Sequence, residues 1–186
     1  MSAKKSSVQC RGKKLTVIDM DLPKRKRNRL KGYSYSQNGI YFLTVCTRNK
    51  ECILGKVVGG GDLDAPQMIL SDYGEIVEKY IQSIENAYNG IKLMNYVVMP
   101  NHIHLIVMLY SDDNIYHKSE LKTSANDTVP VMVSAFKKLV NKEIGFNIWH
   151  RSYHDHVIRN EKGFETIWDY VEDNPVRWKK DCFYCD

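Results

Sequence analysis

The sequence predicts one α+β domain in which a mainly antiparallel sheet is flanked by helices. Short runs rich in β-branched and aromatic residues, typical of strands, alternate with longer runs whose apolar residues recur every three or four positions, typical of amphipathic helices. Two strand-like runs, residues 91–99 and 102–109, follow each other across a tight Pro100-Asn101 turn and should therefore pair as antiparallel neighbours. With 186 residues, 43% of them hydrophobic, the chain can bury the core of one domain.

The first elements are strands. Residues 40–47 combine β-branched, aromatic and other apolar side chains and predict a buried strand. A shorter strand is expected within residues 52–58, followed by a glycine-rich turn at 59–62. Residues 67–70 are expected to pair back on it. The glycine run lacks the spacing and the following lysine of a phosphate-binding loop, so it predicts a hairpin end.

A helix should follow this hairpin. Asp72 and Glu75 have the spacing of a capping box, so we expect the helix to open at Asp72 and to end before Gly90. Its apolar side chains recur with helical spacing and should face the core. They are Tyr73, Ile76, Val77, Tyr80, Ile81 and Ile84.

The second half of the chain contains two further helices. A polar loop is expected at residues 110–126, and a helix at about 127–145. Residues 149–158 are expected to be extended or irregular. The last helix should span about 160–173 and stop at Asn174-Pro175, because the residue before a proline disfavours helix.

The positive charge is concentrated at the beginning of the chain. Residues 1–38 carry eleven Lys and Arg against two Asp, a net charge of +9, and the remainder carries −4, which together give the net +5. We therefore divide the chain into a basic arm at 1–36, a domain at 37–181 and a tail at 182–186. A basic arm attracts phosphate backbones, although a solvated tail is the alternative. Its densest cations, which we expect to bind nucleic acid, are Lys24, Arg25, Lys26, Arg27 and Arg29.

Two histidines form the first candidate site. On a strand, His102 and His104 point to the same face, while Ile103 between them points into the core. Two neutral imidazoles at this spacing can bind one divalent ion, and a third ligand must then come from elsewhere. A bare pair of this kind is more often two half-buried histidines that are satisfied by hydrogen bonds.

A tyrosine on the last predicted helix forms the second candidate site. Tyr170 and Asn174 lie about 40° apart around a helix of about 100° per residue, on one flank of its apolar stripe. The Tyr170 hydroxyl could attack a phosphate while the Asn174 amide completes a metal shell. Because a tyrosine has an ordinary pKa near 10, such a nucleophile needs a nearby cation or base. A boundary tyrosine and a helix-capping asparagine are the alternative.

Together these motifs resemble a known family. Residues 97–106, Val-Val-Met-Pro-Asn-His-Ile-His-Leu-Ile, are similar to the histidine–hydrophobic–histidine (HUH) motif of single-tyrosine transposases. Residues 149–160, with Asp-Tyr at 169–170 and Asn-Pro-Val-Arg at 174–177, resemble the REP-associated tyrosine transposase branch.

The resemblance covers roughly residues 33–180 and implies a function. It implies a ferredoxin-like fold, with His102, His104 and Asn174 as metal ligands and Tyr170 as the catalytic nucleophile. It further implies Mg²⁺ or Mn²⁺ as the ion, single-stranded or hairpin DNA as the substrate, and cutting and rejoining through a 5′-phosphotyrosine intermediate. The enzyme would be a monomer or a homodimer, with the tyrosine acting in its own or a partner's site.

Several alternatives remain open. His154-Asp155-His156 and Tyr153 are a rival histidine pair and nucleophile, although we interpret this segment, with Arg151 and Arg159, as a DNA-facing or structural patch. The protein could also be a catalytically silent or domesticated DNA-binding protein on the same fold. An RNA-binding sheet would need two exposed aromatic residues on central strands, a requirement that Tyr41 and Phe42 do not meet.

The sequence also indicates where in the cell the protein is located. No apolar run approaches the roughly 18 residues that span a membrane, and residues 1–14 lack an apolar signal region. We therefore expect a cytoplasmic protein without a membrane partner. The five cysteines are an odd number at scattered positions, which favours reduced thiols. Cys182 and Cys185 have the spacing of half a zinc knuckle and, without a partner pair, indicate no site.

Overall fold

The structure is a computed structural model. It describes residues 7–10, 13–16, 33–59, 65–110 and 128–184. Its main sheet has four strands. These are β3 at Gly39–Cys46, β6 at Ile91–Met99, β7 at His102–Leu109 and β8 at His154–Ile158. Their order in the sheet is β6-β7-β3-β8, and every neighbouring pair is antiparallel. The expected mainly antiparallel sheet is confirmed.

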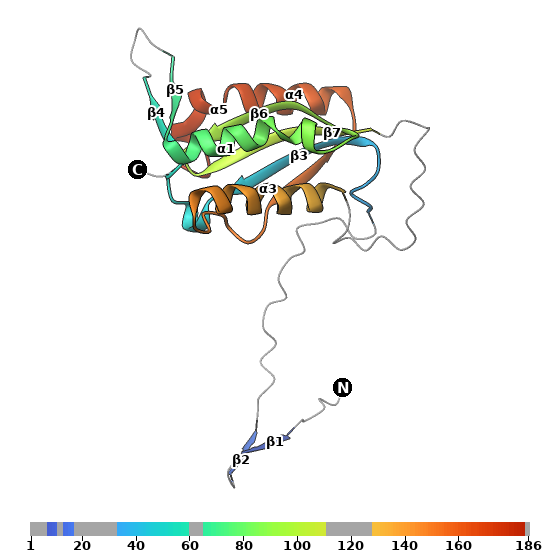
Figure 1. The fold of residues 1–186 in the computed structure, drawn as a ribbon, viewed down its shortest axis with the longest axis vertical. Coiled ribbons are helices and arrows are strands. Elements are labelled where there is room, and N and C mark those ends of the chain that lie inside the picture. The colour runs from blue at the N-terminus through green and yellow to red at the C-terminus, as the bar shows by residue number, and fades with distance from the viewer. Residues whose placement is uncertain (1–6, 11–12, 17–32, 60–64, 111–127, 185–186) are drawn as a thin grey trace.

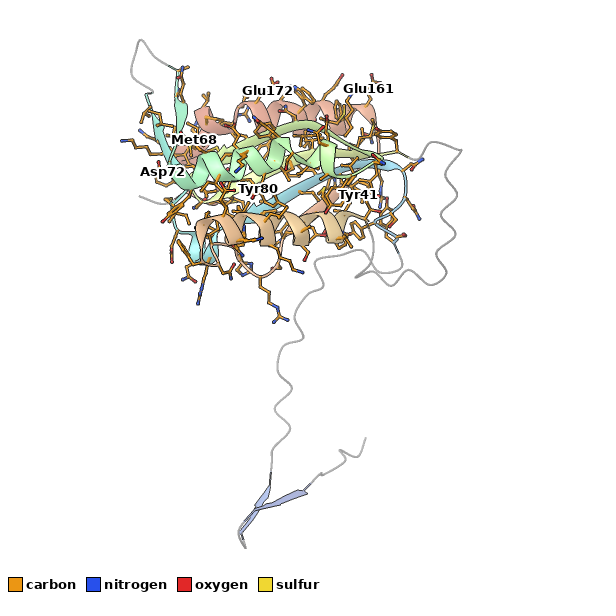
Figure 2. All side chains as sticks on the ribbon, in the orientation of Figure 1. Tyr41, Met68, Asp72, Tyr80, Glu161 and Glu172 are labelled. Atoms are coloured by element: carbon orange, nitrogen blue, oxygen red, sulfur yellow. The ribbon has the colours of Figure 1, made fainter. Side chains whose placement is uncertain are left out.

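Helices cover both faces of this sheet (Figure 1). The first two, α1 at Asp72–Gln82 and α3 at Thr128–Ile144, contact each other and pack on one face. The third, α4 at Glu161–Glu172, lies over the other face, which carries the histidines. Figure 2 shows side chains filling the space between these layers, with Glu161 and Glu172 marking the two ends of α4.

The chain order of these elements gives the ferredoxin-like topology. The main sheet and its two linking helices follow one another as β3-α1-β6-β7-α3-β8. Each β-α-β unit is split, because β7 lies between β3 and β6, and β3 lies between β7 and β8. The α+β fold class predicted from the sequence is therefore confirmed, with α4 added on the second face.

Smaller elements complete the fold. A hairpin is formed by β4 at Gly55–Val58 and β5 at Gln67–Leu70, as the glycine-rich turn predicts. The remaining elements are short. They are β1 at Ser7–Cys10, β2 at Lys13–Thr16, η1 at Arg48–Lys50, α2 at Ile84–Ala87, α5 at Asn174–Arg177 and η2 at Trp178–Lys180.

The core forms on the face shared by α1 and α3. Buried side chains of β3 and β7 meet the expected apolar faces of both helices there, except that Tyr73 of α1 is exposed and lies outside the core. Tyr35 joins the core although it precedes residue 37. The expected stripe of α3 is buried throughout: Val129, Met132, Val133, Phe136 and Val140. A smaller cluster around Ile106 and Val171 holds α4 on the opposite face. Both sides of β7 are thus packed, which fixes the direction of its side chains.

Two helix boundaries differ from expectation. The cap of α1 is Ser71, not Asp72, because its hydroxyl accepts the backbone N–H of Gly74 at 3.2 Å and donates to the Ile53 carbonyl at 2.6 Å. The last helix does end at Glu172, but Asn174-Pro175 does not stop helical structure. Pro175 lies in the first turn of α5, where its missing N–H costs no hydrogen bond.

Other expectations concern the arm, the thiols and the membrane. The arm, in which the sequence predicts little regular structure, contains the antiparallel pair β1 and β2. Cys46 and Cys182 are free thiols, but Cys52 is disulfide-bonded, so the expectation of reduced thiols is wrong at Cys52. Among the described residues, no helix has the length and hydrophobicity to cross a membrane.

Candidate active site

The two histidines lie side by side at the beginning of β7. Strand register pairs His104 with Thr44 of β3 and His102 with Cys46, so all four side chains occupy one face. That face is covered here, and the exposed fractions of His102 and His104 are 0% and 1%. Their Nε2 atoms are 3.1 Å apart. The sequence prediction that the pair shares one face is correct, and the rings are buried deeper than the half-buried pair of the alternative.

Hydrogen bonds fix the orientation of the His102 ring. The Asn101 amide nitrogen donates to the carbonyls of Phe183, at 2.7 Å, and Lys50, at 3.2 Å, so its oxygen faces His102. The His102 Nδ1–H donates to that oxygen at 2.9 Å. In a neutral ring the proton is therefore on Nδ1, and the Nε2 lone pair points toward His104.

The His104 ring has a more adaptable partner. Its Nδ1 lies 2.9 Å from the Thr44 hydroxyl, which can accept or donate a hydrogen bond. If the proton of His104 is on Nε2, that N–H donates to His102 Nε2, and the two rings satisfy each other without a cation. With the proton on Nδ1 instead, Thr44 accepts it and both Nε2 lone pairs converge on one point. Thr44 therefore permits both the metal-free and the metal-binding tautomer.

Burial keeps both imidazoles neutral. Desolvation lowers the pKa of His102 to about 4 from 6.5, with the nearby Asp181 carboxylate opposing and Lys50 adding to the shift. Desolvation also lowers the pKa of His104 well below 6.5, and the neighbouring His102 lowers it further. Neutral imidazole is the form that ligates metal ions, so at neutral pH no proton has to leave.

Tyr170 reaches the histidines from α4. Its hydroxyl oxygen lies 3.4 Å from His104 Nε2 in the same chain, and the two ring centroids are 5.2 Å apart. Phe42 of β3 packs edge-on against Tyr170 at 6.1 Å and stacks on His104 at 5.0 Å. Burial, followed by the Asp181 carboxylate, raises the pKa of Tyr170 above 10. The convergence of both imidazoles and the phenol expected from the motifs is therefore present.

Asn174 follows one helical turn after the tyrosine. Its exposed fraction is 1%, and its side-chain nitrogen and oxygen make no hydrogen bond of good geometry among the described residues, although the amide lies close enough to Tyr170 to lower the pKa of that hydroxyl. A buried amide without partners is costly, so such a group usually marks a missing ligand, water or ion. This is the one ligand predicted from the family resemblance whose own environment indicates an additional bound species.

A carboxylate from the C-terminal segment also enters the site. The Tyr170 hydroxyl donates to Asp181 Oδ2 at 3.3 Å, and the backbone N–H of Phe183 donates to Oδ1 at 2.7 Å. The Phe183 ring packs against His102, with centroids 4.6 Å apart. Sequence reasoning missed Asp181 because it lies in no recognisable motif and follows Tyr170 at a spacing set only by the turns of α5 and η2.

The donor set fits a divalent cation. The ligand atoms of His102, His104 and Asp181 all lie within 4.8 Å of one another. Two nitrogens bound at about 2.1 Å and at right angles on one ion would be about 3.0 Å apart. The observed 3.1 Å between the Nε2 atoms matches this spacing. Two nitrogens with oxygen donors suit Mn²⁺ and related ions as well as Mg²⁺.

The rival site is not assembled. His154 and His156 lie on the histidine face, but β3 separates them from β7, and both are exposed. Tyr153, by contrast, packs into the core on the opposite face, with an exposed fraction of 9%. Tyr153 therefore does not lie beside the histidine pair on β8. Tyr41 is also buried in that core, which leaves the RNA-binding alternative without an exposed aromatic pair on β3.

The remaining predicted residues lie outside this centre. Arg151 and Arg159 are exposed and flank β8, on the segment that also presents His154 and His156. The basic cluster at 24–29 falls outside the described residues. Cys182 is an exposed free thiol, and Cys185 also lies outside the described residues, so the half-knuckle spacing acquires no visible partner pair.

Known proteins are similar to this chain in sequence. The model of the family described as "Transposase IS200 like" matches residues 66–174. An uncharacterized protein of Haemophilus influenzae is 32% identical over 92% of this chain and 99% of its own length. A second protein of that species, named as a REP-associated tyrosine transposase, is 27% identical over 77% of this chain and 73% of its own.

A solved structure agrees with these relatives. A REP-associated tyrosine transposase bound to a REP hairpin matches with a TM-score of 0.56 and 23% identity, over 80% of this chain and 73% of that one. At this identity the likeness is one of fold. The resemblance predicted from the histidine and tyrosine motifs is confirmed by the family match and the relatives together.

Proposed function

Because the chain belongs to the IS200-like transposase family, we propose that it cuts and rejoins single-stranded DNA with Tyr170 as the nucleophile. The observation that carries this proposal is the 3.4 Å separation between the Tyr170 hydroxyl and His104 Nε2. A tyrosine placed beside two buried neutral imidazoles has the geometry needed to attack a phosphate held there.

The residues have distinct chemical roles in this proposal. The Tyr170 oxygen attacks phosphorus, the bond from phosphorus to the 3′-oxygen of the preceding nucleotide breaks, and a 5′-phosphotyrosine forms while the released oxygen takes a proton from solvent to become a 3′-hydroxyl. Asp181 accepts the Tyr170 hydrogen bond at 3.3 Å and can take its proton as the attack proceeds. The bond energy stays in the phosphotyrosine, so a 3′-hydroxyl can reverse the reaction and join a new strand.

We assign the metal site to His102, His104 and Asn174, with Asp181 as an additional donor. When bound there, Mg²⁺ or Mn²⁺ would neutralise the non-bridging phosphate oxygens and polarise the phosphorus. Support comes from the 3.1 Å separation of the two Nε2 atoms and from the buried Asn174 amide beside Tyr170, which makes no hydrogen bond of good geometry among the described residues. Because Tyr170 and the histidines meet within one chain, we propose that the tyrosine acts in its own site.

We further propose that the substrate is a hairpin with single-stranded flanks. The solved structure of similar fold is described as bound to a REP hairpin. Exposed Arg151 and Arg159 offer cations for the phosphate backbone beside β8, and the basic arm offers more. The exposed His154 and His156 lie on the same sheet face as the active site and could contact the strand that enters it.

The experiment is a covalent-adduct assay. Labelled hairpin DNA with single-stranded flanks is incubated with the protein, with and without Mn²⁺, and resolved on a denaturing gel. We expect a protein–DNA adduct that needs the cation, disappears in Tyr170→Phe and persists in the matched control Tyr153→Phe. DNA binding should be nearly unchanged in Tyr170→Phe.

Each other outcome has a definite meaning. An adduct that survives in Tyr170→Phe but is lost in Tyr153→Phe would show that the nucleophile is misassigned. Binding without any adduct under all conditions would identify a catalytically silent DNA-binding protein on this fold. A cation-independent adduct would remove the metal from the proposal and leave the two histidines with a structural role.

A further inference from the structure

A cavity of about 480 Å³ lies beside the candidate active site. Trp178 of η2 lines it, and the same ring contacts the site itself, because its centroid lies 6.1 Å from that of His102. We propose that this cavity binds one unpaired nucleotide of the DNA strand that is cut, next to the scissile phosphate. The inference deepens the proposed function and rests on it.

Three parts of the chain build the cavity. They are the β4-β5 hairpin with Cys52 before it, the turn between β6 and β7, and the segment from α5 to Tyr184. The hairpin stands beside α5, and β5 contacts it (Figure 1). Met68, labelled in Figure 2, marks β5 in this region. The turn that lines the cavity through Pro100 leads directly into His102, so a strand that leaves the active site has only a short distance to cover.

The charge of the lining suits a phosphodiester. Its two formally charged side chains, Lys56 and Lys179, are both cationic, and both are exposed. Among the described residues that line the cavity, none is Asp or Glu. A phosphate beside the opening would thus meet two cations, the charge that stabilises a nucleic acid backbone.

The apolar part of the lining suits a base. Trp178 is 7% exposed and forms a fixed wall, whereas Tyr184 is 40% exposed and packs edge-on against it at 5.4 Å. Pro100 and Pro175 add flat apolar surface. Flat rings next to cations are the elements with which proteins bind unpaired bases without strong sequence preference. The volume falls within the range of about 300–1,000 Å³ typical of small-ligand sites and exceeds what one base needs.

The test measures binding without cleavage. Every protein carries Tyr170→Phe and no divalent cation is added, so covalent chemistry does not contribute. The probes are one DNA hairpin with oligothymidine extensions and the same hairpin with blunt ends. Tyr184→Ala should weaken binding of the extended hairpin by roughly fivefold or more, the loss expected when one stacked base loses its partner. Tyr184→Phe should retain the affinity, and blunt-hairpin binding should not change.

Matched lysines test the contribution of charge. Lys179 lines the cavity, and its exposed neighbour Lys180 does not. Lys179→Gln should therefore weaken binding of the extended hairpin more than Lys180→Gln. Photocrosslinking of 5-bromodeoxyuridine in the extension should map to the peptide that contains Trp178 and Tyr184.

The proposal is overturned if Tyr184→Ala binds the extended hairpin as tightly as its parent. It is also overturned if the two lysine variants behave alike or if the crosslinks map elsewhere. These results leave the adduct assay of the wild-type protein unaffected. Failure of the nucleotide site and failure of the proposed chemistry can therefore be told apart.

Discussion

At the scale of single residues, the site depends on the groups that orient the histidines. Asn101 fixes the proton of His102 on Nδ1 because its own amide is held by two carbonyls. Thr44 holds His104 through a hydroxyl that can serve either tautomer. Such partners raise the basicity of a ligand and prevent ring rotation. The paired imidazoles are therefore preorganised before any cation binds.

We expect Thr44→Val to weaken binding of Mn²⁺ by about 10- to 100-fold, the usual effect of losing a hydrogen-bond partner of a metal-binding histidine. Valine keeps the shape of the buried side chain, which is 6% exposed, but leaves His104 Nδ1 without a partner. Calorimetric titration with Mn²⁺ measures the change. Thr44→Ser, which keeps the hydroxyl, should retain most of the affinity. Equal affinity in the valine variant would show that the Thr44 hydrogen bond does not support binding of the ion by His104.

At the scale of elements, sequence patterns located the strands and helices but not their irregularities. Strand β7 was predictable because its alternating side chains meet a core on each face. In β6, the register shifts between Leu93 and Asn95, a bulge that depends on pairing with β7 and leaves no mark in the local sequence.

In the candidate active site, too, local sequence patterns predicted some features, and other features depend on distant contacts. The local spacing of His102 and His104, and the helical spacing of Tyr170 and Asn174, predicted which side chains share a face. The approach of Asp181 depends on how three successive helical elements, α4, α5 and η2, end, so no local pattern encodes it. The cap at Ser71 was missed because Asp72 offers a competing motif, and only the contact with Ile53 decides between them.

Lys137 of helix α3 holds in place the segment that precedes β8. Lys137 Nζ donates to the carbonyls of His150, at 2.9 Å, and Ser152, at 3.2 Å. Burial lowers its pKa to about 8 from 10.5. At pH values between 8 and 10.5, Lys137 holds its proton in the unfolded chain more than in the folded one. The contribution of this group to the free energy of unfolding therefore rises with pH.

We therefore expect the wild-type protein to gain about 1 kcal/mol of unfolding free energy relative to Lys137→Met between pH 8 and 10.5, a value reduced for partial solvent screening. Urea unfolding of both proteins at several pH values in this window provides the measurement. Lys138→Met, at the exposed neighbouring position, should show no such change relative to the wild type. A difference that is independent of pH would contradict the shifted pKa of Lys137.

At the scale of the whole molecule, charge and chemistry are separated along the chain. Residues 39–186 contain the candidate active site but carry a net charge of −4, whereas residues 1–38 carry +9. A domain with net negative charge is repelled by a polyanion unless local cations or a basic extension compensate. We therefore expect the arm to supply most of the general attraction to DNA, and the exposed arginines and lysines near the site to position the strand.

Deletion of residues 1–31 tests this division, because it removes all eleven Lys and Arg of the arm. Binding of hairpin DNA should weaken most at low salt. The slope of log affinity against log salt should become shallower by about 0.9 for each phosphate contact that is lost. Replacement of Lys24, Arg25, Lys26, Arg27 and Arg29 by Gln, at unchanged chain length, should reproduce much of the effect if charge is its cause. DNA that is bound at saturating concentration should still form the Tyr170 adduct, since the residues that carry the chemistry lie elsewhere. An unchanged affinity and salt slope after the deletion would exclude the arm from DNA binding and assign the attraction to cations of the folded domain.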